Sequence, residues 1–94
     1  MTREEKIAKI VFKFGHNHQY DKTVEEVGEF LQALSKFRNA KPSNYADLLN
    51  KLVEETADLK NMIETVAHMC SFTKTLEKEC DKKLDRTMER YKLK

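Results

Sequence analysis

The sequence predicts an all-α domain, and three observations support this prediction. The 94-residue chain contains only two glycines and one proline, too few for the many turns that a β-sheet needs. Its apolar residues recur at spacings of three and four, the repeat of one face of a helix. A chain of this length forms one domain, so residues 1–94 are expected to fold as a single helical unit.

Composition and charge exclude several classes of protein. With 39% hydrophobic and 36% charged residues the chain is apolar enough to fold, but its core is thin, so a homodimer or homotetramer is expected to complete it. The sequence has no run of about 18 apolar residues and no signal-peptide pattern, so no membrane is expected as a partner. A net charge of +2 is too small to indicate nucleic acid. Cys70 and Cys80 lack metal-ligand spacing and are expected to be reduced, in the cytoplasm.

The first helix is predicted over residues 2–14. Thr2 and Glu5 have the spacing of a capping box, in which each side chain binds the backbone amide of the other residue. Gly15 is a natural end for this helix, and residues 15–21, GHNHQYD, are expected to form a short connection. The side chains expected on the buried face are Ile7, Ile10, Val11 and Phe14.

A second helix is predicted from residue 19 or 23 to residue 39, with Thr23 and Glu26 as an internal capping pair. Pro42, in the segment NAKPSN, has no amide hydrogen and breaks the chain there. Gly28 costs about 1 kcal/mol in a helix relative to alanine, so another helix is expected to pack closely against it. The predicted buried stripe is Val24, Val27, Leu31, Leu34 and, as a further candidate, Phe37.

Two more helices complete the prediction. The third begins after a cap at Ser43 or Asn44 and continues to Met69 or Cys70. Its apolar side chains are Leu48 or Leu49, Leu52, Leu59, Ile63 and Val66. The fourth covers about residues 73–92 and is rich in lysine and arginine. Its few apolar positions, Leu76, Cys80, Leu84, Met88 and Tyr91, indicate that it needs a partner surface or a role for its charges.

Pairs of carboxylates stand out on the two central helices. Glu26 and Glu29 form one pair and Glu55 and Asp58 the other, each at a spacing of three that brings side chains together. Glu29 and Glu55 are equally distant from Pro42 along the chain, and so are Glu26 and Asp58. An antiparallel hairpin that turns at this proline therefore brings the two pairs level, and helix rotation decides whether they face each other.

Four converging carboxylates repel one another unless a positive charge lies among them. Mg²⁺ is the natural candidate, with Mn²⁺ as a substitute, because it binds carboxylate oxygens and shares them with water and substrate phosphates. Softer metals lack ligands here, since the cysteines are isolated and His16 and His18 have no further ligands nearby. The carboxylates therefore predict a magnesium site with phosphate chemistry.

These residues resemble a known family. The segments EEVGEFLQAL and EETADLKNMI resemble the E-x-x-E and E-x-x-D motifs of the MazG-like, all-α nucleoside triphosphate pyrophosphohydrolases. GHNHQYDKTVEEVGEFLQALSKF is similar to the entry segment of small phage and bacterial members, and DKKLDRTMER resembles the basic last helix. The resemblance covers about residues 10–92. It implies an antiparallel hairpin within a four-helix bundle that oligomerisation completes.

The resemblance also implies an activity and a set of site residues. The family cleaves nucleoside triphosphates, ribo or deoxy, between the α and β phosphates, with magnesium, to a monophosphate and pyrophosphate. The same comparison implies a cytoplasmic protein, in the host cytoplasm if a phage encodes it. The implied metal ligands and catalytic groups are Glu26, Glu29, Glu55 and Asp58, with Glu25 and Glu54 as candidates to orient or deprotonate the attacking water. The implied substrate contacts are Lys83 and Arg86 for phosphates, Gln19 and Lys22 in the entry segment, and Met62 where several relatives have an aromatic residue.

Two alternative functions do not depend on efficient catalysis. A helical interaction module would use the acidic face to bind a basic partner, and a nucleotide sensor would keep the metal site but turn over poorly. Lys83 and Arg86 have an alternative as well, since they are also spaced to pair with Glu79 and Glu89 on their own helix.

Overall fold

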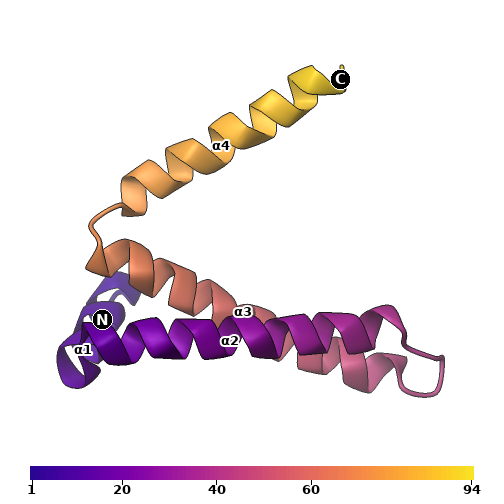
Figure 1. The fold of residues 1–94 in the computed structure, drawn as a ribbon, viewed down its shortest axis with the longest axis horizontal. Coiled ribbons are helices and arrows are strands. Elements are labelled where there is room, and N and C mark those ends of the chain that lie inside the picture. Colours follow the sequence, from indigo (N-terminus) through magenta and orange to yellow (C-terminus); the bar gives the residue numbers. More distant parts are fainter.

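Four α-helices and no strand make up the chain, as the computed structural model of residues 1–94 shows (Figure 1). Helix α1 covers Arg3–Phe14, α2 covers His16–Arg38, α3 covers Tyr45–Met69 and α4 covers Thr73–Arg90. The all-α prediction is confirmed, and the predicted helix ends agree to within about three residues except at the start of α2.

The connection between α1 and α2 is a single residue. Gly15 has φ 85° and ψ 163°, a backbone conformation that is essentially restricted to glycine. Because this residue alone turns the chain, α2 begins at His16, and the prediction of a connection over residues 15–21 is wrong. At the other end of α1 the predicted capping box is present, with Thr2 and Glu5 each bonding to the backbone amide of the other at 3.1 Å.

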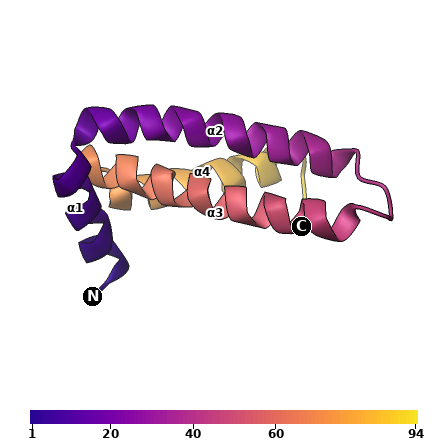
Figure 2. The same cartoon turned by 90° about the horizontal axis from the view of Figure 1, so that it is seen from below.

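Helices α2 and α3 form an antiparallel hairpin and lie side by side (Figure 2). The turn between them contains Pro42, and the amide of Lys41 donates to Asn44 Oδ1 at 2.8 Å. Beside this turn the rings of Phe37 and Tyr45 pack with their centroids 5.3 Å apart. Helix α1 crosses the far end of the hairpin and contacts both of its helices.

The buried face of each hairpin helix repeats at alternating steps of four and three. On α2 this face is formed by Gln19, Thr23, Glu26, Phe30, Ala33 and Phe37, all of them buried or half-buried. On α3 the same spacing runs through Leu48, Leu52, Glu55, Leu59, Met62 and Val66, and Thr65 and Ala67 are also buried near the end of this helix. This is the spacing of an antiparallel coiled coil, in which two glutamates, one glutamine and one threonine occupy positions normally held by apolar residues.

The predicted buried stripe of α2 is wrong except at Phe37. Its other four members lie on the exposed side of the helix, and we call them the outer ridge: Val24, Val27, Leu31 and Leu34. Val24 is 74% exposed and Leu31 58%. Gly28 lies beside them, and a Cβ added there meets no atom within 4 Å, so the expected close packing is absent within this chain. On α3 most of the predicted apolar positions are half-buried, although Ile63 is 45% exposed.

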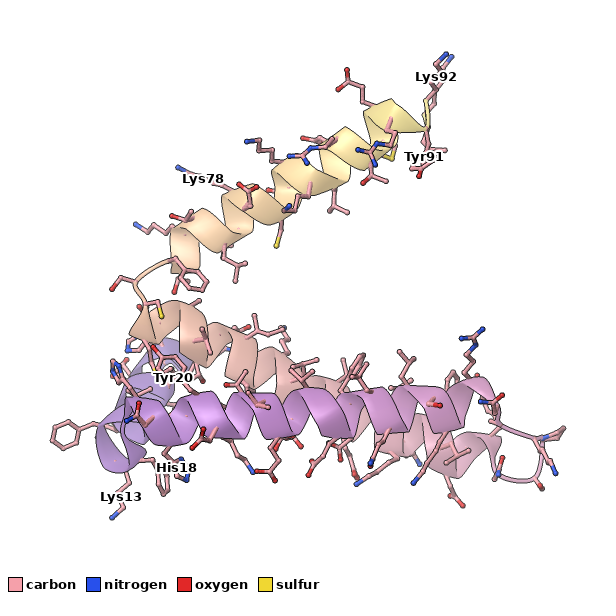
Figure 3. The ribbon with its side chains drawn as sticks, in the orientation of Figure 1. Lys13, His18, Tyr20, Lys78, Tyr91 and Lys92 are labelled. Atoms are coloured by element: carbon pink, nitrogen blue, oxygen red, sulfur yellow. The ribbon has the colours of Figure 1, made fainter.

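Helix α4 stands apart from the hairpin. It has no buried residue and packs only on α3, and the ribbon points away from the other helices beyond a short turn at residues 70–72 (Figure 3). Leu84 and Tyr91, two of its few apolar side chains, are 66% and 65% exposed. The four helices therefore do not close into a complete bundle within one chain. None of them combines the length and apolar content needed to cross a bilayer.

Candidate metal centre

Three carboxylates from the two hairpin helices converge at one place. Glu26 and Glu29 come from α2 and Glu55 comes from α3, and each offers an oxygen that lies within 4.8 Å of the other two. Glu26 and Glu55 occupy the buried faces of their helices and are only 4% and 5% exposed, whereas Glu29 is exposed at the edge. The hairpin thus joins two buried acids and one accessible acid.

Each buried carboxylate has one satisfied oxygen and one unsatisfied oxygen. Lys22 Nζ lies 3.2 Å from Glu26 Oε1, and Lys51 Nζ lies 2.9 Å from Glu55 Oε1. The Oε2 atoms of both glutamates are buried and have no hydrogen-bond partner. Buried polar atoms are nearly always paired, and an unpaired carboxylate oxygen in a low-dielectric interior is costly. Two such oxygens in one cluster favour a bound cation.

The electrostatics of the cluster also favour added positive charge. The negative charge of Glu26 is the largest cause that raises the pKa of Glu29, and burial and Glu55 act in the same direction. The hydrogen bond from Lys51 lowers the pKa of Glu55 against the opposing effect of burial. The hydrogen bonds to the two glutamates raise the pKa values of Lys22 and Lys51. Two ammonium groups thus partly neutralise three carboxylates.

The spacing of the carboxylates suits one divalent cation. Mg²⁺ holds oxygen ligands at about 2.0–2.1 Å, so ligands on opposite sides of one ion are about 4.2 Å apart. The carboxylate oxygens of this cluster lie within 4.8 Å of one another, so small side-chain movements would bring them to the distances that one ion requires. Three protein oxygens leave about three octahedral positions for water or for phosphate oxygens.

Asp58 does not belong to the cluster. Its side chain is exposed and its carboxylate is outside the group of three, although it lies one helical turn beyond Glu55. Glu25 and Glu54 are exposed too, and Glu25 lies 3.9 Å from Lys22 Nζ. These three acids remain candidates whose side chains point to solvent in this structure.

The predicted substrate-binding residues are dispersed. Gln19 is 4% exposed, and its Oε1 lies 3.0 Å from His18 Nδ1. Lys22 binds the cluster itself through Glu26, and Met62 is buried in the hairpin. Lys83 and Arg86 are exposed on α4, which contacts α3 alone. Within one chain, only Lys22 of this set lies at the carboxylates.

Sequence reasoning missed the second lysine of the cluster. Lys51 lies four residues before Glu55, as Lys22 lies four residues before Glu26, and the pattern K-x-V-E-E occurs in both helices. A lysine at this spacing reaches the glutamate one turn further along the helix. The repeated pattern was the signal that would have identified a matched pair of lysines.

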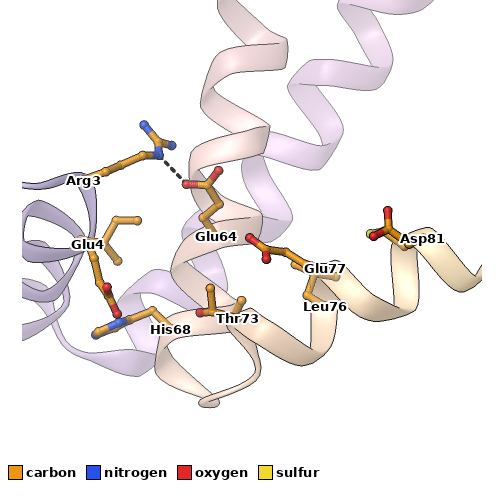
Figure 4. Close-up of a pocket in the computed structure, with 11 residues that line it drawn as sticks. Arg3, Glu4, Glu64, His68, Thr73, Leu76, Glu77 and Asp81 are labelled. Atoms are coloured by element: carbon orange, nitrogen blue, oxygen red, sulfur yellow. Dashed lines mark hydrogen bonds and ion pairs between the residues drawn. The ribbon is translucent and has the colours of Figure 1, made fainter.

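Another cavity of the molecule lies away from this cluster. It has a volume of about 680 Å³ and lies between α1, α3 and α4, with Glu4, Glu64 and Glu77 among its lining residues (Figure 4). Arg3 Nε donates to Glu64 Oε2 at 2.5 Å across one side of it. None of its lining residues belongs to the carboxylate cluster, and it contains no buried unsatisfied oxygen. We therefore place the candidate site at Glu26, Glu29 and Glu55.

Comparisons with known proteins do not identify a relative. No protein-family model matches the chain, and neither the curated proteins nor the solved structures give a significant match. The resemblance to the MazG-like family therefore remains a prediction from sequence motifs.

Proposed function

We propose that the chain is a magnesium-dependent nucleoside triphosphate pyrophosphohydrolase. The observation that carries this proposal is the pair of buried, unpartnered Oε2 atoms of Glu26 and Glu55 beside the carboxylate of Glu29. In the reaction one water is consumed and the phosphoanhydride bond between the α and β phosphates breaks. A nucleoside monophosphate, pyrophosphate and a proton are released. Mn²⁺ has the same ligand preference and is expected to substitute.

The three carboxylates have distinct roles in this proposal. Glu26 and Glu55 are held rigidly by the hairpin, so they would fix the ion, which supplies charge neutralisation for the triphosphate. Glu29 is the exposed member of the cluster and can reach a water molecule, so it is our candidate for the group that accepts its proton. Asp58 would join the ligands by rotation of its exposed side chain.

An assay of pyrophosphate release tests the activity. The eight common ribo- and deoxyribonucleoside triphosphates are each incubated with magnesium and either the unaltered chain or Glu29→Gln. We expect release that requires magnesium and falls by at least a hundredfold in the variant. A folded protein that releases nothing from any of the eight nucleotides would contradict the proposal.

The exposed apolar surface supports an oligomer. The outer ridge of α2 and the apolar side chains of α4 are uncovered in one chain, and surfaces of this kind are typical of interfaces. We propose that a second copy of the chain packs against them. The resulting assembly is a homodimer, or a homotetramer made of two such dimers. In such an assembly Lys83 and Arg86 are available to the phosphates bound by another copy. Analytical ultracentrifugation of Leu31→Glu beside the unaltered chain tests this, with a shift to monomer as the expected result.

The same exposed surface favours a second candidate, a helical interaction module without catalysis. This candidate requires the carboxylates to be indifferent to divalent cations. It therefore predicts equal melting temperatures in magnesium and in chelator, whereas the enzyme predicts a higher one in magnesium.

A further inference from the structure

A second, smaller cavity opens directly beside the carboxylate cluster. It has a volume of about 230 Å³, and its lining residues are Glu29, Gln32, Ala33 and Lys36 of α2 with Lys51 and Glu55 of α3. Two of the three clustered carboxylates thus form part of its wall. A group bound in this cavity would lie next to any cation held by Glu29 and Glu55.

The remaining polar lining carries hydrogen-bond donors. Lys36 forms no ion pair with any carboxylate, although it lies on the same cavity as Glu29 and Glu55. Lys51 is bound to Glu55 Oε1 at 2.9 Å, and Gln32 adds a side-chain amide. Lysine binds phosphate as a mobile point charge, so two lysines beside a cation site add positive charge for an anion bound there.

The volume restricts what can bind there. Pockets that enclose a drug-sized ligand have volumes of roughly 300–1,000 Å³, and this cavity is smaller. It admits a short chain of phosphate groups but not a whole nucleotide. The base and sugar would then lie outside the cavity. Its lining residues would therefore recognise only the phosphate chain of the ligand.

We propose that this cavity binds the phosphate chain of a magnesium-bound polyphosphate, with Lys36 and Lys51 as its anion-binding residues. The assignment rests on the proposed function, because it requires a cation on Glu29 and Glu55. The buried, unpartnered Oε2 of Glu55 provides that cation site independently of the lysines. A cation on Oε2 would offset the negative charge of Glu55, which would weaken its attraction for the Lys51 ammonium at Oε1 and leave that ammonium free to contact the anion.

This exchange gives Lys51 two opposite effects. It competes with the cation for Glu55, so its removal strengthens magnesium binding. It also contacts the anion, so its removal weakens the binding of magnesium pyrophosphate. Lys36 has only the second effect, because it pairs with no carboxylate of the cluster.

Isothermal titration calorimetry on the full chain tests the proposal, with magnesium alone and then pyrophosphate in excess magnesium as probes. We expect Lys36→Met to weaken pyrophosphate binding at least tenfold and to leave magnesium affinity within twofold. Lys36→Arg should retain most of the affinity. Lys51→Met should weaken pyrophosphate binding but strengthen magnesium binding severalfold. Lys60→Met, an exposed lysine of α3 away from the cavity, is the control and should change neither.

The outcomes separate this inference from the proposed function. If the unaltered chain does not bind magnesium, the metal centre fails and the cavity assignment fails with it. If magnesium binds but pyrophosphate binds equally well to the unaltered chain and to Lys36→Met, the assignment of the lysines is overturned and the metal centre stands. Far-UV circular dichroism verifies that each variant is folded.

Discussion

Lys51 Nζ lies 2.9 Å from Glu55 Oε1, one turn apart on α3. The ammonium is the only ion-pair partner of a carboxylate that is 5% exposed, and Lys22 has the same spacing from Glu26 on α2. These two lysines act as counter-ions to two buried acids inside the hairpin. The folded state without metal therefore depends on them.

Replacement of Lys51 by methionine should destabilise the metal-free protein. The substitution removes the ion pair of Glu55. Loss of an ion pair between residues four apart on a helix should lower the melting temperature of a domain of this size by roughly 2–4 °C. Thermal unfolding in a chelator, followed by circular dichroism, measures the effect. Lys60→Met, on the same helix without an ion pair, should melt like the unaltered chain; equal losses in both variants would remove the special role of Lys51.

Magnesium should stabilise the folded chain through Glu55. A cation that binds only the folded state adds about 2.7 kcal/mol to the free energy of unfolding when its free concentration is 100 times its Kd. Urea unfolding with and without magnesium measures this gain. Glu55→Gln should abolish it, and the adjacent Glu54→Gln, whose side chain is exposed, should retain it. A gain of the same size in both variants would place the ion elsewhere.

Gly15→Ala should destabilise the protein by about 1–3 kcal/mol, because any other residue is strained at φ 85° and ψ 163°. Space is not the cause, since a Cβ at Gly15 meets nothing within 4 Å. Urea unfolding provides the measurement. A loss well below 1 kcal/mol would show that α1 and α2 are joined by a different backbone path.

Gly28→Ala should have an effect that depends on protein concentration. At Gly28 the helix is open to solvent within one chain, so alanine should stabilise a monomer by up to about 1 kcal/mol. If a second copy packs on the outer ridge, the added methyl group should weaken association. Sedimentation velocity and thermal melting over a range of concentrations separate the two effects. A gain in stability at every protein concentration would contradict the packing of a second copy on the outer ridge.

The pKa of Tyr20 should lie above its ordinary value of 10.0. Its hydroxyl lies 3.6 Å from Cys70 Sγ, and this hydrogen bond is the main cause that raises the pKa of Tyr20 above 10.0. A raised pKa stabilises the folded state below the unfolded value and loses that contribution as pH rises through the folded value. Cys70→Ala should lower the pKa toward 10.0 in a ¹³C NMR titration of the tyrosine ring. Cys80→Ala is the control, since Cys80 lies on α4.

The sequence predicted the helices well and the orientation of α2 badly. Local signals decide where helices begin and end, and the capping box at Thr2, the turn at Pro42 and the stop at Gly15 are all local. Two residue series on α2 share the same spacing, however, one containing Val24 and Leu31 and the other Gln19 and Glu26. Hydrophobicity favoured the first series, whereas packing against α3 buries the second, and no local signal distinguishes them.

The candidate site was predicted only in part for the same reason. Glu29 and Glu55 are equally far from Pro42 along the chain, which correctly predicted that they lie level with each other. In the structure both lie in one cluster with Glu26. Helix rotation then leaves Asp58 at the surface. The cavity beside Lys36 could not be predicted, because it depends on how far apart the two helices lie.

The buried glutamates also limit how the two hairpin helices can slide past each other. A coiled-coil pattern alone tolerates a slip of seven residues, which shifts one helix by about 10 Å along its axis. Such a slip would separate Glu26 from Glu55 by more than one cation can bridge, and would bring Glu26 level with Leu48 or Met62, according to its direction. The native alignment is the one in which both acids meet, so the groups proposed to bind the ion would also select the register in which the hairpin folds.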